Sequence, residues 1–316
     1  MTVLITGGAG FIGSHIADFL LGQEHRVNVL DNLSAGSVSN LEKWDRSENL
    51  KFVRGDLRDP SSIKVALEGC DTVYHLAANP EVRSWLASPG DHFRQNVEGT
   101  FNLLEVMREK SCVEKLVFTS TSTVYGEPDV IPTPEDYAPL KPISNYGASK
   151  LAAEALICSY SSMYGFRSVI YRMANVVGPR SNHGVTFDFV GKLRRNPGEL
   201  EVLGDGSQSK SYLYIEDCVD GMVAGVEATD EGVEILNIGS EDRVDVLTIA
   251  RTVIEEMGLS DVEIRLTGGV DGGRGWKGDV KIMQLDMGRL KSLGWRPRYG
   301  SGEAIRLTAK SLLSPQ

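Results

Sequence analysis

The chain has 316 residues, of which 41% are hydrophobic and 24% charged, with a formal net charge of -10. This composition is ordinary for a globular protein of one large or two average domains, and the negative charge without a basic stripe argues against a nucleic-acid binder. No apolar run approaches membrane-spanning length, so we expect no membrane contact and predict a cytoplasmic location.

The cysteines are scattered singly and none forms a Cys-x-x-Cys pair. They are Cys70, Cys112, Cys158 and Cys218. This pattern favours reduced thiols in a cytosolic protein over disulfides or zinc ligands. The five histidines show no ligand spacing either, so no metal site is predicted.

The first patterned stretch is Thr6–Gly13, which follows an apolar run and leads into the amphipathic run Phe11–Leu21. Its glycines lie where a first strand would turn into a first helix. We expect Gly7 to permit the turn, Gly10 to let the backbone approach a pyrophosphate, and Gly13 to let the helix pack on the strand. The N–H groups at the start of that helix would face the phosphates. The alternative is a glycine-rich turn without a ligand.

A second strand-like run, Arg26–Leu30, ends in Asp31, about 20 residues beyond the glycines. A carboxylate there accepts hydrogen bonds from ribose hydroxyls and repels a 2′-phosphate, which predicts NAD rather than NADP as the cofactor. The alternative is a surface Asp after an unrelated turn.

Short β-branched runs alternate with amphipathic stretches through the first half of the chain. The predicted strands are Val3–Thr6, Val27–Leu30, Lys51–Val53, Thr72–Leu76, Leu116–Ser120 and Ser168–Arg172. Predicted helices between them include Pro60–Leu67, Asp91–Lys110 and Tyr146–Tyr164. This alternation implies right-handed crossovers, and so a doubly wound parallel α/β sheet of the Rossmann type with helices on both faces. A ligand should lie beyond the carboxyl ends of the strands.

The pattern changes in the second half, where loops rich in Gly, Pro and Asn separate short elements. We predict a Rossmann domain that binds NAD over residues 1–174 and a smaller mixed α/β substrate domain over 175–316, with 212–239 returning to the sheet. The glycine-rich stretch Thr267–Gly278 also carries Arg274 and basic and aromatic neighbours, which indicates a loop over a ligand.

Tyr146 and Lys150 are the residues on which chemistry would depend. They lie four residues apart at the start of a predicted helix, so the ammonium can reach the neighbourhood of the phenol. A free tyrosine has a pKa of about 10, and a nearby cation lowers it. The strand before this helix ends in the hydroxyl-rich segment Thr119–Thr123, which could offer a hydroxyl to a substrate oxygen. The alternative is an exposed helix pair.

Motifs along nearly the whole chain form one pattern. They are Gly7–Gly13, Asp31-Asn32, Gly55–Leu57, His75–Ala78, Asn96–Thr100, Thr123–Gly126, Tyr146–Lys150, Arg172–Asn175, Val202–Gly206, Lys210–Tyr212 and Gly278-Asp279. Together they resemble an extended short-chain dehydrogenase/reductase, and within that superfamily the UDP-glucose (UDP-galactose) 4-epimerase family.

The resemblance implies a reaction and a role for each matching residue. Tyr146 would be the acid/base on the sugar 4-hydroxyl, Lys150 would lower the Tyr146 pKa and hold the nicotinamide ribose, and Thr121 would hydrogen-bond the same hydroxyl. Hydride would pass from C4 to tightly held NAD and return to the other face of a 4-keto sugar. The residues implied to bind NAD are Gly7, Gly10, Phe11, Ile12, Gly13, Asp31, Asn32, Ser34, Gly36, Asp56, Leu57, Leu76, Ala77, Ala78, Asn96, Thr119, Tyr146, Lys150 and Ala174. Those implied to bind a UDP-hexose are Thr121, Tyr146, Asn175, Val185, Lys210, Tyr212, Arg274 and Asp279.

Sibling families differ in the short segment before Val124. The nucleotide-sugar 4,6-dehydratases need an acid just before Val-Tyr-Gly, and the decarboxylases typically carry Glu there, whereas this chain has Ser122 and Thr123. The predicted function is therefore interconversion of UDP-glucose and UDP-galactose. The alternatives are a UDP-GlcNAc or UDP-glucuronate 4-epimerase or a 4,6-dehydratase, and, more remotely, an NAD-sensing regulator without catalysis, which would usually lack the Tyr and Lys pair.

Some positions depart from the family pattern. Lys210 stands where family members commonly have an Arg that contacts the nucleotide phosphates. Arg83 lies near a position at which many members have a Lys. The family's Arg before Gly-Asp is not in register here, and we assign its diphosphate contact to Arg274. Each could instead be an ordinary surface residue. Met283 stands at the position whose side chain, in the family, often limits the size of the sugar pocket. Because Met is smaller than Tyr, we predict that UDP-N-acetyl sugars are accepted. By analogy with the superfamily, the helix carrying Tyr146 should help to form a homodimer.

Overall fold

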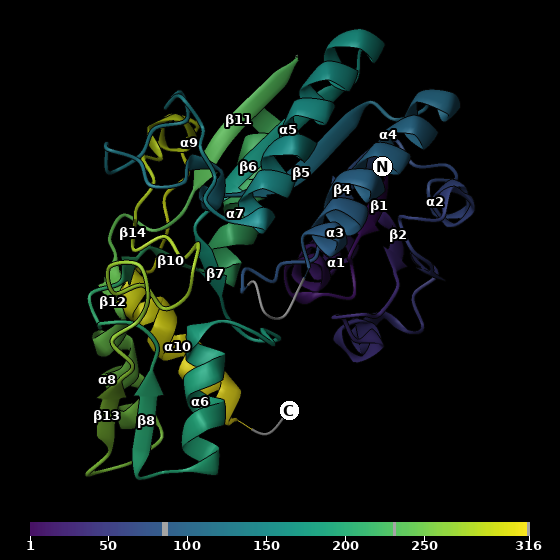
Figure 1. The fold of residues 1–316 in the computed structure, drawn as a ribbon. Coiled ribbons are helices and arrows are strands. Elements are labelled where there is room, and N and C mark those ends of the chain that lie inside the picture. Colours follow the sequence, from purple (N-terminus) through teal and green to yellow (C-terminus); the bar gives the residue numbers. More distant parts are fainter. Residues whose placement is uncertain (84–87, 230–231, 315–316) are drawn as a thin grey trace.

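The computed structural model describes residues 1–83, 88–229 and 232–314. Its centre is a seven-stranded sheet in the order β11-β6-β5-β4-β1-β2-β3 (Figure 1). The strands are β1 (Thr2–Thr6), β2 (Arg26–Asp31), β3 (Leu50–Arg54), β4 (Thr72–His75), β5 (Lys115–Thr121), β6 (Arg167–Met173) and β11 (Val233–Ile238). All neighbouring strands are parallel. Each strand predicted in the first half is present, and the predicted doubly wound fold is confirmed.

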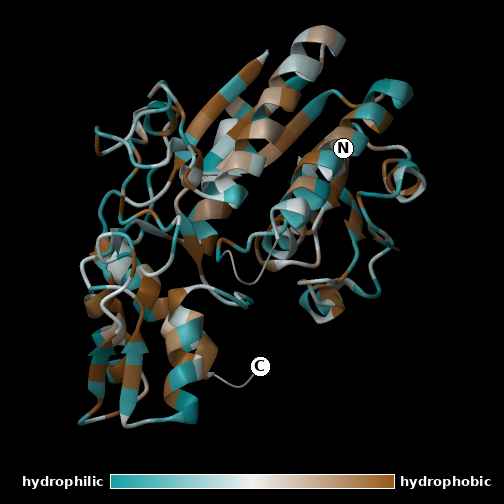
Figure 2. Cartoon of the chain, viewed as in Figure 1, coloured by the Kyte–Doolittle hydropathy of each residue, from teal (hydrophilic) through white to brown (hydrophobic). Residues whose placement is uncertain are grey.

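Helices cover both faces of this sheet, because its strands are hydrophobic on both sides (Figures 1 and 2). In β1, Val3 and Ile5 belong to one core cluster and Leu4 to the other. The first cluster is shared with α1 and α7, and the second with α2, α4 and α5. The helices are α1 (Phe11–Gly22), α2 (Pro60–Ala66), α4 (Gly99–Lys110), α5 (Asn145–Tyr164) and α7 (Ile215–Ala228).

The helix predicted to end at Lys110 is not regular over its whole length. It is divided into α3 (Pro89–His92), the π-helical segment η2 (Phe93–Glu98) and α4. The side chain of Asn96 is drawn away from η2: its Nδ2 donates to Ser149 Oγ at 2.9 Å, and its Oδ1 accepts from Asn79 N at 2.7 Å. Helical periodicity predicts the span of such a segment, but not a local widening held by contacts with other elements.

The second half builds a group of smaller elements beside the sheet (Figure 1). Its helices are α6 (Val185–Arg195), α8 (Val246–Glu256), α9 (Gly288–Ser292) and α10 (Ser301–Leu313). Its strands are β7 (Asn175–Val177), β8 (Glu199–Val202), β9 (Ser209–Lys210), β10 (Tyr212–Tyr214), β12 (Val244–Asp245), β13 (Glu263–Leu266) and β14 (Ile282–Met283). They form the pairs β10-β7 and β13-β8 and the three-stranded sheet β12-β9-β14. Two 3-10 segments, η1 (Val38–Trp44) and η3 (Ser122–Tyr125), complete the fold.

The last residue of β4, His75, is fully enclosed between two hydroxyls. Its Nδ1 lies 2.8 Å from Thr6 Oγ1 and its Nε2 lies 2.9 Å from Thr100 Oγ1, so the imidazole joins β4 to β1 and α4. Burial lowers the pKa of His75 to about 3, and the charge of Lys150 acts in the same direction. The ring is therefore neutral in the folded protein at any physiological pH.

We expect this histidine to make stability fall as the solution is acidified. Below the usual pKa of 6.5 the unfolded imidazole binds a proton, whereas the folded one stays neutral down to about pH 3. The unfolded state then holds more protons, so the free energy of unfolding should drop by about 1.4 kcal/mol per pH unit in that window. Urea unfolding of the wild type and of His75→Gln at pH 7, 6 and 5 tests this, because the variant should show the shallower dependence; equal slopes would contradict it.

Candidate active site

A cavity of about 790 Å³ lies at the carboxyl ends of the central strands and is closed on its other side by elements of the second half. This is the position at which a doubly wound sheet binds its ligand. The predicted site residues that line it are Gly7, Gly10, Phe11, Ile12, Gly13, Asp31, Asn32, Ser34, Gly36, Asp56, Leu57, Leu76, Ala77, Ala78, Thr119, Thr121, Tyr146, Lys150, Ala174, Asn175, Val185, Lys210, Tyr212 and Asp279. Residues far apart in the chain thus share one cavity.

The glycine turn after β1 is built by close backbone contacts. Gly7 has φ of 70°, a conformation that favours glycine, and its N–H donates to Leu30 O at 2.8 Å. A Cβ on Gly13 would lie 2.2 Å from the Gly7 carbonyl oxygen, so the helix start and the turn touch directly. Gly10 is the N-cap of α1 and makes no side-chain cap. The first N–H groups of α1 therefore face the cavity side of the turn without a capping side chain, which suits a phosphate.

Asp31 at the end of β2 is buried, and both of its carboxylate oxygens hold the surrounding backbone. Oδ2 accepts from Ala9 N at 3.0 Å and Oδ1 from Leu33 N at 2.8 Å. Since each oxygen can accept more than one hydrogen bond, lone pairs remain for the ribose hydroxyls that the sequence predicted. Gly36 is needed beside it, because a Cβ there would lie 2.7 Å from the Ala9 backbone.

Asp56 follows β3 and lies next to this site. Asn32 Nδ2 donates to Asp56 Oδ2 at 2.8 Å, and Arg58 Nε donates to Asp56 Oδ1 at 3.0 Å. The hydrogen bonds from Arg58 hold the pKa of the Asp56 carboxyl well below its usual range. The residues around the turn, from the open helix start to the two carboxylates, fit a dinucleotide with unmodified ribose hydroxyls.

Tyr146, Lys150 and Thr121 converge at the end of β5. Ser144 Oγ accepts from Gly147 N at 3.0 Å and so fixes the first turn of α5, which carries Tyr146. Burial raises the pKa of Tyr146 to about 12, and a hydrogen bond with Thr121 acts in the opposite direction. Lys150 Nζ donates to Thr119 O at 2.7 Å, and burial lowers the pKa of Lys150 to about 7, against the charge of Glu154.

The protein by itself therefore favours a neutral phenol, and burial weakens the hold of the Lys150 ammonium on its proton. The phenolate needs added positive charge in the cavity before Tyr146 can accept a proton. The roles of Tyr146, Lys150 and Thr121 are proposals, which rest on the shared cavity that the three side chains line and on the hydrogen bond between Tyr146 and Thr121.

The other end of the cavity carries the residues predicted to hold the sugar nucleotide. Lys210 Nζ donates to Asp279 Oδ1 at 2.6 Å, and the ammonium lies 5.5 Å from the centre of the Trp276 ring. Met283 is buried and also lines the cavity. Val185 begins α6, whose N-cap, Gly184, has no capping side chain.

Two predicted site residues do not line the cavity. Asn96 is buried behind it and links η2 to α5, as described above. Arg274 Nη2 is hydrogen-bonded to Glu127 and forms an ion pair with it. Trp276, two residues later, lines the cavity instead. The contact with Glu127 holds the Arg274 side chain away from the cavity. The spacing of residues in the sequence does not predict such a contact between distant loops.

The cavity wall also contains an ionic cluster that the sequence does not predict. Arg83 donates from Nε and Nη2 to the two oxygens of Glu81, at 2.8 and 2.9 Å, and Nη1 lies 3.5 Å from Asp188 Oδ2. Arg83 had been considered as a replacement for a family Lys, but neither carboxylate could be assigned to it from the sequence. Only the packing of α6 beside the loop after β4 brings Asp188 to this place.

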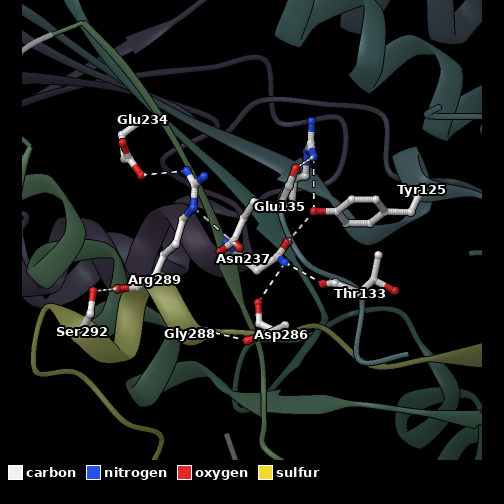
Figure 3. A network of polar contacts seen from close by, with 10 residues as sticks. Tyr125, Thr133, Glu135, Glu234, Asn237, Asp286, Gly288, Arg289 and Ser292 are labelled. Carbon is white, nitrogen blue, oxygen red and sulfur yellow. Dashed lines mark hydrogen bonds and ion pairs between the residues drawn. The ribbon is translucent and has the colours of Figure 1, made fainter. Parts of the chain in front are cut away.

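Figure 3 shows a polar network that joins η3 and the loop before α5 to β11 and the C-terminal part of the chain. Tyr125 Oη donates to Asn237 Oδ1 at 2.7 Å, and Asn237 Nδ2 donates to Thr133 O and Asp286 O, each at 2.9 Å. Glu135 Oε1 accepts from Asn237 N at 2.9 Å. The amide of Asn237 therefore connects η3, the loop before α5, the edge strand β11 and the segment that follows Met283.

Cysteines, metals and membranes add no further site. The cysteines are free. Within the described ranges, no group of three or more His, Cys, Asp or Glu side chains could hold a metal ion. Over the same ranges no helix has the length and apolar character needed to cross a membrane.

Comparison with known proteins identifies relatives over nearly the whole chain. The family model described as the NAD dependent epimerase/dehydratase family matches residues 3–239. A crystal structure of a UDP-galactose 4-epimerase is 45% identical, with a TM-score of 0.87 and coverage of 99% of this chain and 98% of that one. The UDP-glucose 4-epimerase of Thermus thermophilus in complex with NAD is 34% identical, with a TM-score of 0.85 and coverage of 98% of each chain. UDP-glucuronic acid decarboxylase 3 of Arabidopsis thaliana is 33% identical over 97% of this chain and 87% of that protein.

Proposed function

Because the chain belongs to the NAD-dependent epimerase/dehydratase family, whose cofactor is NAD and whose substrates are nucleotide sugars, we propose that it interconverts UDP-glucose and UDP-galactose. The observation that carries this proposal is the convergence of Tyr146, Thr121 and Lys150 at one cavity whose wall carries hydroxyl side chains, and no acid, in the segment before Val124. The positions where the related eliminating and decarboxylating enzymes typically carry an acid are Ser122 and Thr123, and both line the cavity.

The side chains divide the work of an epimerisation. Tyr146 removes the proton from the sugar 4-hydroxyl and returns it at the end, Thr121 hydrogen-bonds the same oxygen, and Lys150 stabilises the phenolate by its charge. When bound, NAD would supply the reversible hydride transfer at C4 that these side chains cannot provide. The glycine turn and Asp31 hold the dinucleotide, and the second half of the chain holds the nucleotide sugar.

The charges of the cavity wall support a neutral hexose over a uronic acid. Among the described residues, the basic groups on the substrate side have carboxylate partners: Arg83 has Glu81 and Asp188, Lys192 has Glu201, and Lys210 has Asp279. A sugar carboxylate would have to displace one of these partners to find a cation, and it would meet Glu81 or Asp188 in the same wall. A neutral sugar needs only hydroxyl contacts.

The test uses the purified protein with UDP-galactose and no added NAD, and measures UDP-glucose by chromatography. We expect conversion, because the cofactor is retained in the cavity. If none occurs, the assay is repeated with NAD and then with UDP-glucuronate. A decarboxylated product would instead indicate a decarboxylase, and a keto-deoxy product a 4,6-dehydratase. If no substrate is converted although NAD is bound, the protein is better explained as an NAD-sensing regulator.

The Met283 side chain leads us to propose a second group of substrates. It lines the cavity in place of a bulkier gate, so the enzyme should also convert UDP-N-acetylgalactosamine. The comparison is the turnover of this sugar by the wild type and by Met283→Tyr. We expect the variant to lose it while retaining UDP-galactose turnover, and brisk UDP-galactose turnover by the wild type with none of the N-acetyl sugar would contradict the idea.

We also propose that the protein is a homodimer through α4 and α5. Phe93 of η2, Phe101 of α4 and Met163 of α5 are 59, 41 and 69% exposed, which is unusual for large apolar side chains. Sedimentation equilibrium should give twice the chain mass for the wild type. Phe101→Glu should lower it toward one chain, whereas Val65→Glu on α2, at a similarly exposed position, should not. A wild-type mass of one chain would refute the dimer.

A further inference from the structure

One helical turn beyond Lys150, α5 turns a second ionisable side chain, Glu154, toward the sheet. Lys150 and Glu154 are each only 3% exposed. Positions four residues apart lie on the same helix face, so the buried carboxylate and ammonium are neighbours. No role in the proposed reaction has yet been given to Glu154.

The carboxylate of Glu154 is fixed by partners on two strands. Ser120 Oγ is hydrogen-bonded to Glu154 Oε1, and Arg172 Nη2 donates to Oε2 at 2.8 Å. Ser120 and Arg172 are direct neighbours in the register of β5 and β6. Charge-assisted hydrogen bonds of this kind hold a side chain in one position. Glu154 therefore fastens α5 to the strand end that carries Thr121.

Arg172 does not depend on Glu154 alone for its position. Its Nη1 donates to Tyr125 Oη at 3.2 Å and to Glu135 O at 3.0 Å. Tyr125 in turn belongs to the network around Asn237 (Figure 3). The guanidinium is thus anchored on the side away from α5 and keeps the Glu154 carboxylate at the strands.

Lys150 has no such counter-ion in contact. Its ammonium donates to Thr119 O and lies 4.5 Å from the centre of the Phe118 ring, and none of the ion pairs within the described residues includes it. A buried cation needs an opposite charge nearby to stay protonated. Glu154 acts in that direction, whereas burial acts against it. The other titratable groups around this pair are Arg172, Cys158, His75 and Tyr146, with Tyr125 on the far side of Arg172.

We propose that Glu154 is a positioning residue of the reaction, whose carboxylate, held at the strands by Ser120 and Arg172, keeps the Lys150 ammonium charged and free to serve Tyr146. In this arrangement the Glu154 carboxylate pairs with Arg172 and also stabilises the charge of Lys150 without contacting it. A direct ion pair would tie the ammonium down, whereas a fixed carboxylate one turn away supports its charge without occupying its hydrogens. The kinetic part of this inference rests on the proposed function of Tyr146 and Lys150.

The experiment separates this electrostatic role from a structural one. Glu154→Gln alone leaves the Arg172 guanidinium buried without its counter-ion and should lower the melting temperature. The double variant Glu154→Gln/Arg172→Met removes both charges and should recover most of that loss. The Lys150 pKa should fall by about one unit in the double variant, and further in the single variant, where the Arg172 charge is left unopposed. It is measured by NMR of lysine labelled with ¹³C at the ε carbon, with the Lys150 signal identified by its absence in Lys150→Met.

The kinetic readout is the pH profile of kcat. Because the ammonium loses its proton at lower pH without the carboxylate, the alkaline limb should move to lower pH in the double variant, by the same amount as the NMR titration. If the double variant regains its melting temperature and Lys150 titrates as in the wild type, Glu154 is structural only and the proposal fails.

A second variant decides the question if the double variant does not fold. Glu154→Asp keeps the charge for Arg172 but withdraws it from Lys150, so it should give a smaller titration shift in the same direction, and an unchanged titration would refute the proposal. The NMR titration needs no substrate, so it still gives an answer if the protein converts no UDP-sugar, an outcome that would count against the proposed function alone.

Discussion

Replacing Tyr146 by Phe is expected to lower kcat for UDP-galactose by about 10²- to 10⁴-fold, the usual contribution of a positioned acid/base group. This loss corresponds to about 3–5 kcal/mol of transition-state stabilisation. The ring of Tyr146 is partly buried beside His92, with 6.2 Å between ring centres, and Phe preserves that packing. Only the hydroxyl and its hydrogen bond with Thr121 are removed. The fold and the affinity for UDP-galactose should therefore change little.

The measurement is a comparison of kcat, KM and melting temperature with those of Tyr164→Phe. Tyr164 lies at the other end of α5 and is 46% exposed, so its variant controls for the loss of a tyrosine hydroxyl from the same helix. A Tyr146→Phe enzyme that keeps more than a tenth of the wild-type kcat would show that another group moves the proton.

Gly13→Ala is expected to cost the protein most of its bound NAD. The added Cβ would lie 2.2 Å from Gly7 O and 2.8 Å from Gly8 Cα, and both contacts are with backbone atoms that cannot rotate away. The helix start must therefore move off the turn. Overpacking of this kind costs about 1–3 kcal/mol. Because the N–H groups at the start of α1 move with it, NAD affinity should fall by about tenfold or more, since each 1.4 kcal/mol is a factor of ten.

Gly22→Ala provides the matched control within the same helix. A Cβ at Gly22, the last residue of α1, meets no heavy atom within 4 Å. Since Ala is a better helix former, this variant should be neutral or up to about 1 kcal/mol more stable. NAD content after purification and urea unfolding midpoints check both variants, and a Gly13→Ala protein that carries as much NAD as Gly22→Ala would contradict the expectation.

The first half of the fold could be predicted because its strands, helices and turns depend on residues that are close together in the sequence. A strand buried on both faces requires an apolar run such as Val3–Ile5, a helix requires periodic burial, and a turn as tight as that at Gly7 requires glycine. The residues that follow the strands were found for the same reason. Once the sheet is parallel, Asp31 and Thr121 must meet at one edge, however far apart they lie in the chain.

The rest of the site depends on contacts that no local pattern records. Arg274 was chosen for its charge and its place in a loop, but its pairing with Glu127 is decided by how two distant loops meet. The same is true of Arg83, whose partner Asp188 comes from α6. The sequence analysis expected a cation beside Tyr146, and the structure adds that burial opposes both the cation and the phenolate, a property that follows from packing alone.

The Asn237 amide limits how the specificity of this enzyme can be redesigned. One side chain on the edge strand holds two carbonyl groups, one before α5 and one just after the segment that lines the sugar end of the cavity. A loop graft that brings residues 279–287 from a relative with another sugar preference would arrive without its matched partner. Such a chimaera should fold and keep its activity only when the stretch around Thr133 is exchanged together with it. The two segments therefore have to be replaced as one unit.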